Sequence, residues 1–170
     1  TAALFERAGV AASEAIEEEM RWARHFAEAS AGQTQPRSLV FTDTQPGNFV
    51  IGKDGHARCV DLEKTMYGAP TIDLAHLTIR PSIGWDPAVA TRIGLADVAD
   101  FYAAYLARAD ARYRDALRPW LAPMRRLTWL RTITIFAKMK AEWRRGGWSG
   151  EDLEPAFRDH VLSHIARCHD

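Results

Sequence analysis

Residues 38–62 of this 170-residue chain, SLVFTDTQPGNFVIGKDGHARCVDL, carry the strongest fold signal in the sequence. Short apolar runs at 38–41, 48–51 and 57–62 are typical of three strands. Between the last two runs, Gly52-Lys53-Asp54-Gly55 has the composition of a hairpin turn. The stretch therefore predicts a small β element that contains a β-hairpin.

Patterns typical of helices flank this β element on both sides. Over residues 3–30, apolar side chains recur every three or four positions, and Gly32 and Pro36 then end the pattern. After the element we expect a short helix from Thr71 to Leu77, a loop over 81–87, and one or two helices over 88–109 with a break near Gly94. Further on we expect a long helix over about 113–145 with Pro119 or Pro123 as a kink, and a last helix over about 152–168 capped by Ser149 and Asp152. The predicted fold class is α+β and mostly helical.

Charge and cysteine content argue against several function classes. The 22 Lys and Arg residues balance 22 Asp and Glu residues, which argues against bulk attraction to nucleic acid or to an anionic membrane. Cys59 and Cys168 lie far apart, so neither a disulfide framework nor a Cys-x-x-Cys metal motif is expected. The sequence has no apolar run of 18 residues and no signal-peptide pattern. We therefore expect a cytoplasmic protein without a membrane partner; the overall charge also disfavours nucleic acid as a partner, although it says nothing of local patches.

Asp43, Asn48 and Asp61 form the pattern most suggestive of chemistry. They are spaced as D-x4-N-x12-D, with turn residues after the first Asp and the predicted hairpin between Asn48 and Asp61. The turn at Pro46-Gly47 would bring Asn48 back beside Asp43, and the hairpin would return Asp61 to the same end of the sheet. Phosphoryl transfer needs a carboxylate that orients a hydroxyl and accepts its proton, and oxygen ligands for Mg²⁺. The spacing fits that chemistry, although ordinary turns use the same residue types.

Three linked segments resemble the aminoglycoside phosphotransferase and choline kinase family of protein-kinase-like enzymes. The segments are residues 39–48 (LVFTDTQPGN), 60–63 (VDLE) and 68–75 (GAPTIDLA). The family pattern is close to LVHGDLHPGN, then a hairpin, then IDFE and GxPxxDLA, in the same order. The resemblance covers residues 38–77 by motif, and it covers the flanking helices by pattern only.

The resemblance implies a role for each polar residue of these segments. Asp43 corresponds to the catalytic base that orients the substrate hydroxyl, and Asn48 and Asp61 correspond to the Mg²⁺ ligands. Asp73 resembles the helix-start Asp that braces the catalytic loop, so we expect it to be structural. Glu63 either assists the metal or holds the loop. The implied activity is ATP- and Mg²⁺-dependent transfer of a phosphoryl group to a small-molecule hydroxyl.

The chain departs from the family pattern at two positions and in its extent. Phe41 and Gln45 stand where the family usually has His. No lysine precedes Lys53 and no glycine-rich phosphate loop precedes Asp43, although kinase-like enzymes carry both in an N-terminal nucleotide lobe. We therefore expect the C-terminal lobe alone over residues 1–170, with a leading helix and linker at 1–35, catalytic and metal-binding loops at 36–80 and a helical substrate-side part at 81–170. The nucleotide lobe would be supplied by the same or another chain.

Several alternatives remain open at this level. The same fold could serve as a non-catalytic binding or scaffold domain, as the missing lobe and Phe41 suggest. The cationic stretch 118–145 could be a nucleic-acid face or the solvated side of a long helix. His160, His164 and Cys168 have a helical spacing that zinc could use. Tryptophans could form a cage for a quaternary ammonium or pack in the core, and they are Trp85, Trp120, Trp129, Trp143 and Trp148.

Overall fold

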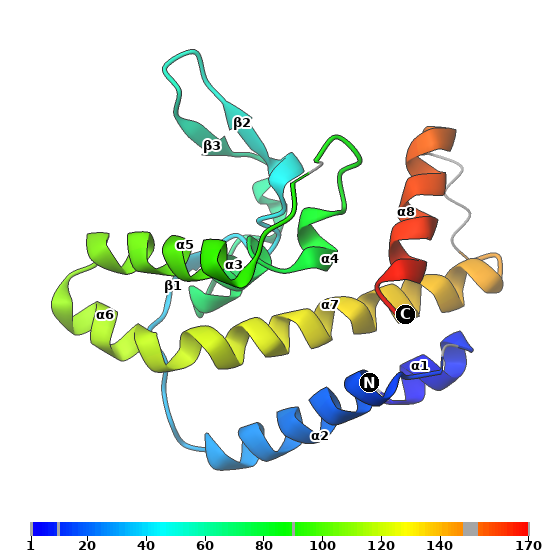
Figure 1. Cartoon of the computed structure of the whole chain (residues 1–170), viewed down its shortest axis with the longest axis horizontal. Helices are drawn as coiled ribbons and strands as arrows, with labels where there is room; N and C mark the ends of the chain where they lie inside the picture. The colour runs from blue at the N-terminus through cyan, green and yellow to red at the C-terminus, as the bar shows by residue number, and fades with distance from the viewer. Residues whose placement is uncertain (1, 10, 90, 148–152, 170) are drawn as a thin grey trace. The chain divides into compact units, whose positions relative to one another are not determined.

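The computed structural model describes residues 2–9, 11–89, 91–147 and 153–169, and Figure 1 labels its helices and strands. The chain divides into two compact units. Unit 1 comprises Thr1–Ala31 and Trp129–Asp170, and unit 2 comprises Gly32–Thr128. Helices dominate, and small antiparallel sheets accompany them, which is compatible with the predicted α+β class.

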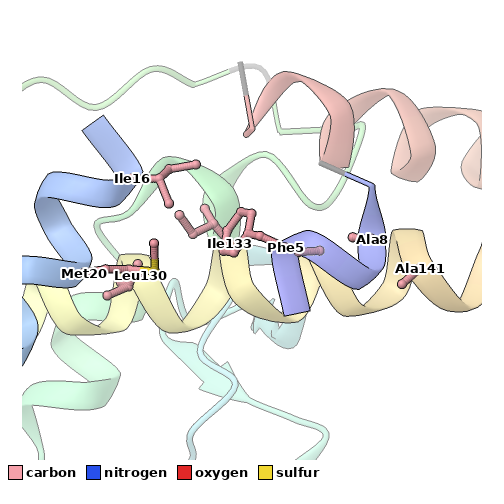
Figure 2. Packing of buried hydrophobic residues seen from close by; sticks show 8 residues of the cluster. Phe5, Ala8, Ile16, Met20, Leu130, Ile133 and Ala141 are labelled. Carbon is pink, nitrogen blue, oxygen red and sulfur yellow. The ribbon is translucent and has the colours of Figure 1, made fainter. Parts of the chain in front are cut away.

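Unit 1 is helical throughout its described elements. It contains α1 (Ala2–Ala8), α2 (Glu14–Ala29), the part of α7 (Leu121–Arg144) from Trp129 onward, and α8 (Pro155–Arg167). The α7 side chains that enter the core recur every three or four residues, as one face of a helix requires. Figure 2 shows this core, which consists of Phe5, Ala8, Ile16, Met20, Leu130, Ile133, Ala137 and Ala141. Trp129 packs against it, so this tryptophan has a structural role.

The prediction of one helix over 3–30 is wrong, because the structure has two. Gly9 has φ +57°, a left-handed conformation that ends α1 and that glycine adopts without strain. Ser13 then caps the start of α2 with its side-chain oxygen. Arg144 donates to the backbone carbonyls of Ala8 and Gly9, which the end of α1 leaves without helical partners. The apolar period continues across the break and therefore conceals it in the sequence.

The last helix begins at Pro155, three residues later than expected. Glu154 caps it by accepting a hydrogen bond from the Phe157 N–H at 3.2 Å. Pro155 occupies the first turn, where its missing N–H costs no helical hydrogen bond. Ser149 and Asp152, which the sequence predicts as the cap, lie outside the described residues.

Unit 2 contains two short antiparallel sheets among its described residues. β2 (Phe49–Ile51) and β3 (Ala57–Cys59) form the predicted hairpin, with Phe49 opposite Cys59. β1 (Ser38–Val40) pairs instead with β4 (Met66–Gly68), a strand that the sequence analysis did not identify. The β1–β4 pairing brings together the segment that precedes Asp43 and the segment that follows Asp61.

Two short 3-10 helices flank the hairpin. They are η1 (Pro46–Asn48) and η2 (Leu62–Lys64). The strands are accordingly shorter than the apolar runs predict, because Asn48 belongs to η1 and Asp61 is the residue that precedes η2. Both candidate metal ligands therefore lie just outside regular strands: Asn48 is the last residue of η1, and Asp61 is a left-handed residue before η2.

The helices of unit 2 differ from the predictions at two prolines. They are α3 (Thr71–His76), α4 (Arg80–Ile83), α5 (Leu95–Arg108), α6 (Ala111–Leu117), η3 (Arg118–Trp120) and the start of α7. The prediction of a loop from residue 81 is wrong, because Pro81 occupies the first turn of α4, where proline is tolerated. The long helix predicted over 113–145 is interrupted by η3, which contains Pro119.

A second hydrophobic cluster anchors the helices of unit 2. Its buried members are Leu74, Leu106, Leu117 and Leu121, and four aromatic residues pack against it: Phe101, Tyr102, Tyr105 and Tyr113. Burial is the main reason that the pKa of Tyr105 rises to about 12. Leu74 belongs to α3, so the cluster fixes the helix that carries Asp73.

Among the described residues, no helix combines the length and the apolar character that crossing a membrane requires.

Truncation of Leu117 is expected to destabilise unit 2 strongly. This side chain is fully buried, so Leu117→Ala removes apolar contacts and leaves a cavity that costs about 2–5 kcal/mol. Leu95→Ala is the matched control, because Leu95 is 80% exposed on α5 and its loss should cost less than about 0.5 kcal/mol. Urea unfolding followed by far-UV circular dichroism measures both. Equal effects would contradict the assignment of this core.

Candidate active site

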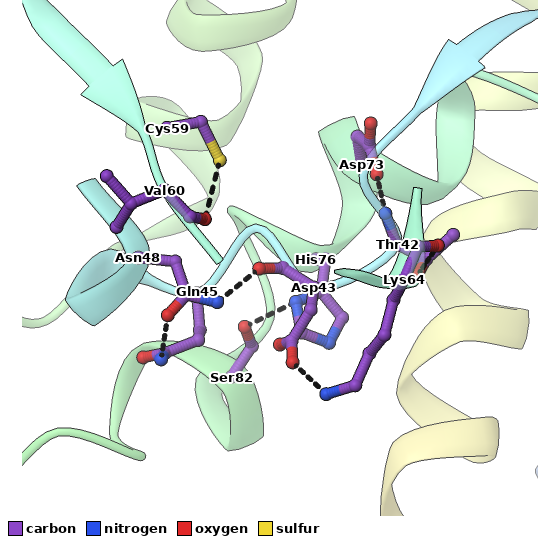
Figure 3. A network of polar contacts seen from close by, with 10 residues as sticks. All are labelled: Thr42, Asp43, Gln45, Asn48, Cys59, Val60, Lys64, Asp73, His76 and Ser82. Atoms are coloured by element: carbon purple, nitrogen blue, oxygen red, sulfur yellow. Dashed lines mark hydrogen bonds and ion pairs between the residues drawn. The ribbon is translucent and has the colours of Figure 1, made fainter. Parts of the chain in front are cut away.

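Asp73 ties the candidate catalytic loop to α3 (Figure 3). Its carboxylate accepts two hydrogen bonds, from the Phe41 N–H to Oδ2 and from the Thr42 N–H to Oδ1, each at 2.8 Å. The hydroxyl of Thr44 donates to the Asp73 backbone carbonyl at 2.9 Å. In the same helix, the buried imidazole of His76 forms a 2.9 Å hydrogen bond with the Ser82 hydroxyl. The loop that carries Asp43 is therefore fastened on both sides of that residue.

Thr42 adopts a left-handed backbone conformation, with φ +64°. This conformation is rare for a β-branched residue and costs of order 1–3 kcal/mol unless neighbouring contacts enforce it. Two contacts do so here. Asp73 accepts the Thr42 N–H, and the Thr42 hydroxyl donates to the backbone carbonyl of Lys64 at 3.1 Å. The turned backbone sets the direction in which the chain enters Asp43.

Asn48 has its amide held in one orientation by two partners. Its Nδ2 donates to the Asp43 backbone carbonyl at 2.8 Å, and its Oδ1 accepts from Gln45 Nε2 at 3.0 Å. The other end of the Gln45 amide accepts the Gly47 N–H at 3.0 Å. Asn48 is buried, so this network fixes the side chain beside the Asp43 backbone.

Asp61 is brought close to Asn48 by the end of the hairpin. The N–H of Val60, the preceding residue, donates to the Asn48 backbone carbonyl at 2.8 Å. Asp61 itself is left-handed, with φ +58°, and its side chain is exposed and forms no capping hydrogen bond. The structure therefore brings together the segments that carry Asp43, Asn48 and Asp61, and it leaves the Asp61 carboxylate available.

Lys64 joins this site although the sequence analysis did not select it. Its Nζ lies 2.7 Å from Oδ2 of Asp43, and the two residues are 21 positions apart. The pKa of the Lys64 ammonium is raised, first by this hydrogen bond and further by the charges of Asp43, Asp61 and Glu63. Lys64 is therefore charged at neutral pH. No motif marks it, because the contact depends on how η2 turns the backbone after Asp61.

The donor groups present fit a hard divalent cation. Asn48 offers an amide oxygen, which keeps a second lone pair beside the bond from Gln45, and Asp61 offers a free carboxylate. Mg²⁺ accepts oxygen ligands and usually binds through one or two protein groups together with water and phosphate oxygens. In the part of the chain that the structure describes, no group of three His, Cys, Asp or Glu side chains could hold a metal.

That finding also bears on the helical candidates for zinc. The rings of His160 and His164 stack with centroids 6.0 Å apart, and Cys168 Sγ lies 3.8 Å from His164 Nε2. These described residues form no metal-holding group. Trp148, one member of the proposed aromatic cage, lies outside the described residues.

Comparison with known proteins supports the chemistry that the site geometry suggests. A family model described as the phosphotransferase enzyme family matches residues 2–120. The chain belongs to this family. Neither the curated proteins nor the solved structures that were compared contain a match. Membership of the phosphotransferase family implies phosphotransferase activity in general, and the matched range contains Asp43, Asn48, Asp61, Lys64 and Asp73.

Removal of the Asp73 carboxylate is expected to loosen the loop without disturbing distant helices. Asp73→Ala leaves the N–H groups of Phe41 and Thr42 without their acceptor, at a cost of about 1–3 kcal/mol. Amide hydrogen exchange at these two residues should accelerate about tenfold or more. Asp97→Ala is the control, since Asp97 accepts a backbone N–H from Gly94 at the start of α5. Unchanged exchange at both loop amides would show that Asp73 does not hold the loop.

Proposed function

We propose that this chain provides the catalytic lobe of an ATP- and Mg²⁺-dependent phosphotransferase that acts on a small-molecule hydroxyl. In this proposal, the chain folds as the C-terminal lobe of a kinase-like enzyme. The observation that carries it is the arrangement of Asp43, Asn48 and Asp61 around one loop that Asp73 fastens. Membership of the phosphotransferase family supports the reaction class.

Asp43 is the proposed proton acceptor. Its side chain is 26% exposed, which leaves it accessible to a substrate, and Oδ2 accepts a hydrogen bond from Lys64. The other oxygen, Oδ1, has no hydrogen-bond partner among the described residues, so it can receive the substrate hydroxyl. A carboxylate in this role orients the attacking oxygen and takes up its proton as the new bond to phosphorus forms.

Asn48 and Asp61 are the proposed ligands of Mg²⁺. When bound, this ion would neutralise charge on the phosphates, which is the main electrostatic requirement of phosphoryl transfer. Gln45 would hold the Asn48 amide in the orientation that presents its oxygen. Glu63 is exposed two positions after Asp61 and would add negative charge near the metal site.

The proposed partner is a nucleotide-binding lobe, in the same chain or in another. Large apolar side chains are exposed on the hairpin and after it: Val50, Ile51, Val60 and Leu62 are each 41–66% exposed. Apolar surface of this kind is suited to a covering lobe or to the adenine base. The small-molecule acceptor is proposed only by class, because the family model names no substrate.

Turnover of the full-length protein tests this function. The assay measures ADP release from ATP with Mg²⁺ across a panel of hydroxyl compounds that includes amino alcohols, sugars and aminoglycosides. Asp43→Asn should lower kcat by about 10²- to 10⁴-fold, because general-base catalysis is lost. Asp61→Ala should act through the metal and abolish Mg²⁺-dependent turnover.

Asp54→Asn is the matched control for this assay. Asp54 is an acid of the same hairpin, but it pairs with Arg58 at the hairpin turn and lies outside the proposed site. Its loss should leave turnover unchanged. Turnover that survives both Asp43→Asn and Asp61→Ala would refute the proposed site. A folded full-length protein without any turnover would favour a non-catalytic binding or scaffold domain.

A further inference from the structure

The ion pair between Lys64 and Asp43 differs from the local surface ion pairs of the described residues. Its ammonium reaches Asp43 across 21 positions of sequence at 2.7 Å. The pairs Arg58–Asp54 and Lys138–Glu142 instead join residues four positions apart. Local pairs of that kind form wherever the spacing allows and contribute little. The Lys64 contact requires two separate segments to be held in register.

The backbone around Lys64 is anchored to the catalytic loop. Its carbonyl accepts the Thr42 hydroxyl at 3.1 Å, one residue before Asp43. On its other side, the Thr65 N–H closes the η2 turn by donating to the Leu62 carbonyl at 3.1 Å. The backbone of Lys64, from which the side chain extends, is therefore fixed relative to Asp43. The ammonium end remains reachable from solvent, since 55% of the side chain is exposed.

The ammonium has donor capacity that Asp43 does not use. A lysine ammonium carries three N–H donors and no acceptor, and one of them bonds to Oδ2 of Asp43. The other two can donate to water or to a bound anion, because 55% of the side chain is exposed. In phosphoryl transfer, the acceptors that come nearest to the base are the oxygens of the transferred phosphoryl group, on which charge is spread in the transition state.

We propose that Lys64 is a catalytic residue that bridges the base and the transferred phosphoryl group. It holds Oδ2 of Asp43, so that Oδ1 receives the substrate hydroxyl, and it donates a second hydrogen bond to a γ-phosphoryl oxygen of the nucleoside triphosphate. This inference rests on the proposed function. It adds to that function a cation from the catalytic lobe itself, placed three residues after the candidate metal ligand Asp61.

The reaction balances without any change in Lys64. The hydroxyl oxygen forms a bond to the γ-phosphorus while the bond from that phosphorus to the bridging oxygen breaks. The electron pair of the broken bond leaves with the nucleoside diphosphate, and the hydroxyl proton passes to Asp43. Lys64 keeps its proton throughout and contributes charge and hydrogen bonds, which are worth most where the reacting group develops charge.

Nucleotide binding separates this role from a structural one. Isothermal titration calorimetry on the full-length protein with Mg²⁺ compares ADP with the β,γ-imido analogue of ATP, which carries the γ-phosphoryl group but is not transferred. Lys64→Met should weaken binding of the analogue about tenfold, the usual weight of a charged hydrogen bond, and should leave ADP binding within about twofold. Lys64→Arg should restore most of the affinity for the analogue.

Lys138→Met is the control, since it removes a lysine from an exposed ion pair in unit 1 and should change neither affinity. Thermal unfolding of each variant tests whether it is folded at the assay temperature. Should Lys64→Met unfold below the assay temperature, Lys64→Gln makes the same comparison.

Each outcome decides between the inference and the function on which it rests. If Lys64→Met weakens ADP and the analogue equally, or weakens neither, the bridging role is overturned while the proposed function stands. If the wild-type protein binds neither nucleotide, the proposed function fails and this inference fails with it. Selective loss of the analogue, with recovery in Lys64→Arg, supports the bridge.

Discussion

The carboxylate of Asp73 is the contact on which the rest of the site depends. It accepts the N–H groups of Phe41 and Thr42 and thereby holds a left-handed threonine immediately before Asp43. Asp73 is itself fixed, because its neighbour Leu74 is buried in the hydrophobic cluster of unit 2. The packed core thus fixes the short helix α3, α3 fixes the strained loop, and the loop fixes the position of Asp43. Strain of this kind persists only where its surroundings enforce it.

Hydrogen bonds to backbone carbonyls connect this loop to the other groups of the site. Asn48 donates to the Asp43 carbonyl, and its own carbonyl receives the N–H that precedes Asp61. Asp61 is the second left-handed residue of the site, and after it η2 returns Lys64 to Asp43. The Lys64 ammonium therefore contacts Asp43, and the negative charges of Asp61 and Glu63 also act to raise its pKa. A dense local charge of both signs suits a reaction in which a divalent cation and phosphate oxygens must be positioned together.

Much of this site could be predicted from sequence, because its parts follow local rules. The hairpin has a glycine turn and apolar flanks, and the D-x4-N-x12-D spacing fits it. What the sequence concealed depends on contacts across the chain. Lys64 reaches Asp43 because η2 follows a left-handed Asp61. Strand β4 has only three residues, and it is recognisable as a strand through its pairing with β1. Two helix boundaries were also concealed. The apolar period runs unbroken past Gly9, and Pro81 suggests a loop although the first turn of a helix accepts it.

The proposed function requires that Asn48 and Asp61 bind one divalent metal ion close to the proposed base Asp43. Paramagnetic broadening by Mn²⁺ tests it most directly, with isotope-labelled full-length protein, ATP and substoichiometric Mn²⁺, observed by amide nuclear magnetic resonance. Selective broadening is expected at residues 43–48 and 61–64, and it should disappear in a variant that combines Asn48→Ala and Asp61→Ala. Broadening centred elsewhere, for example at His160 and His164, or broadening that persists in the double variant, would contradict it.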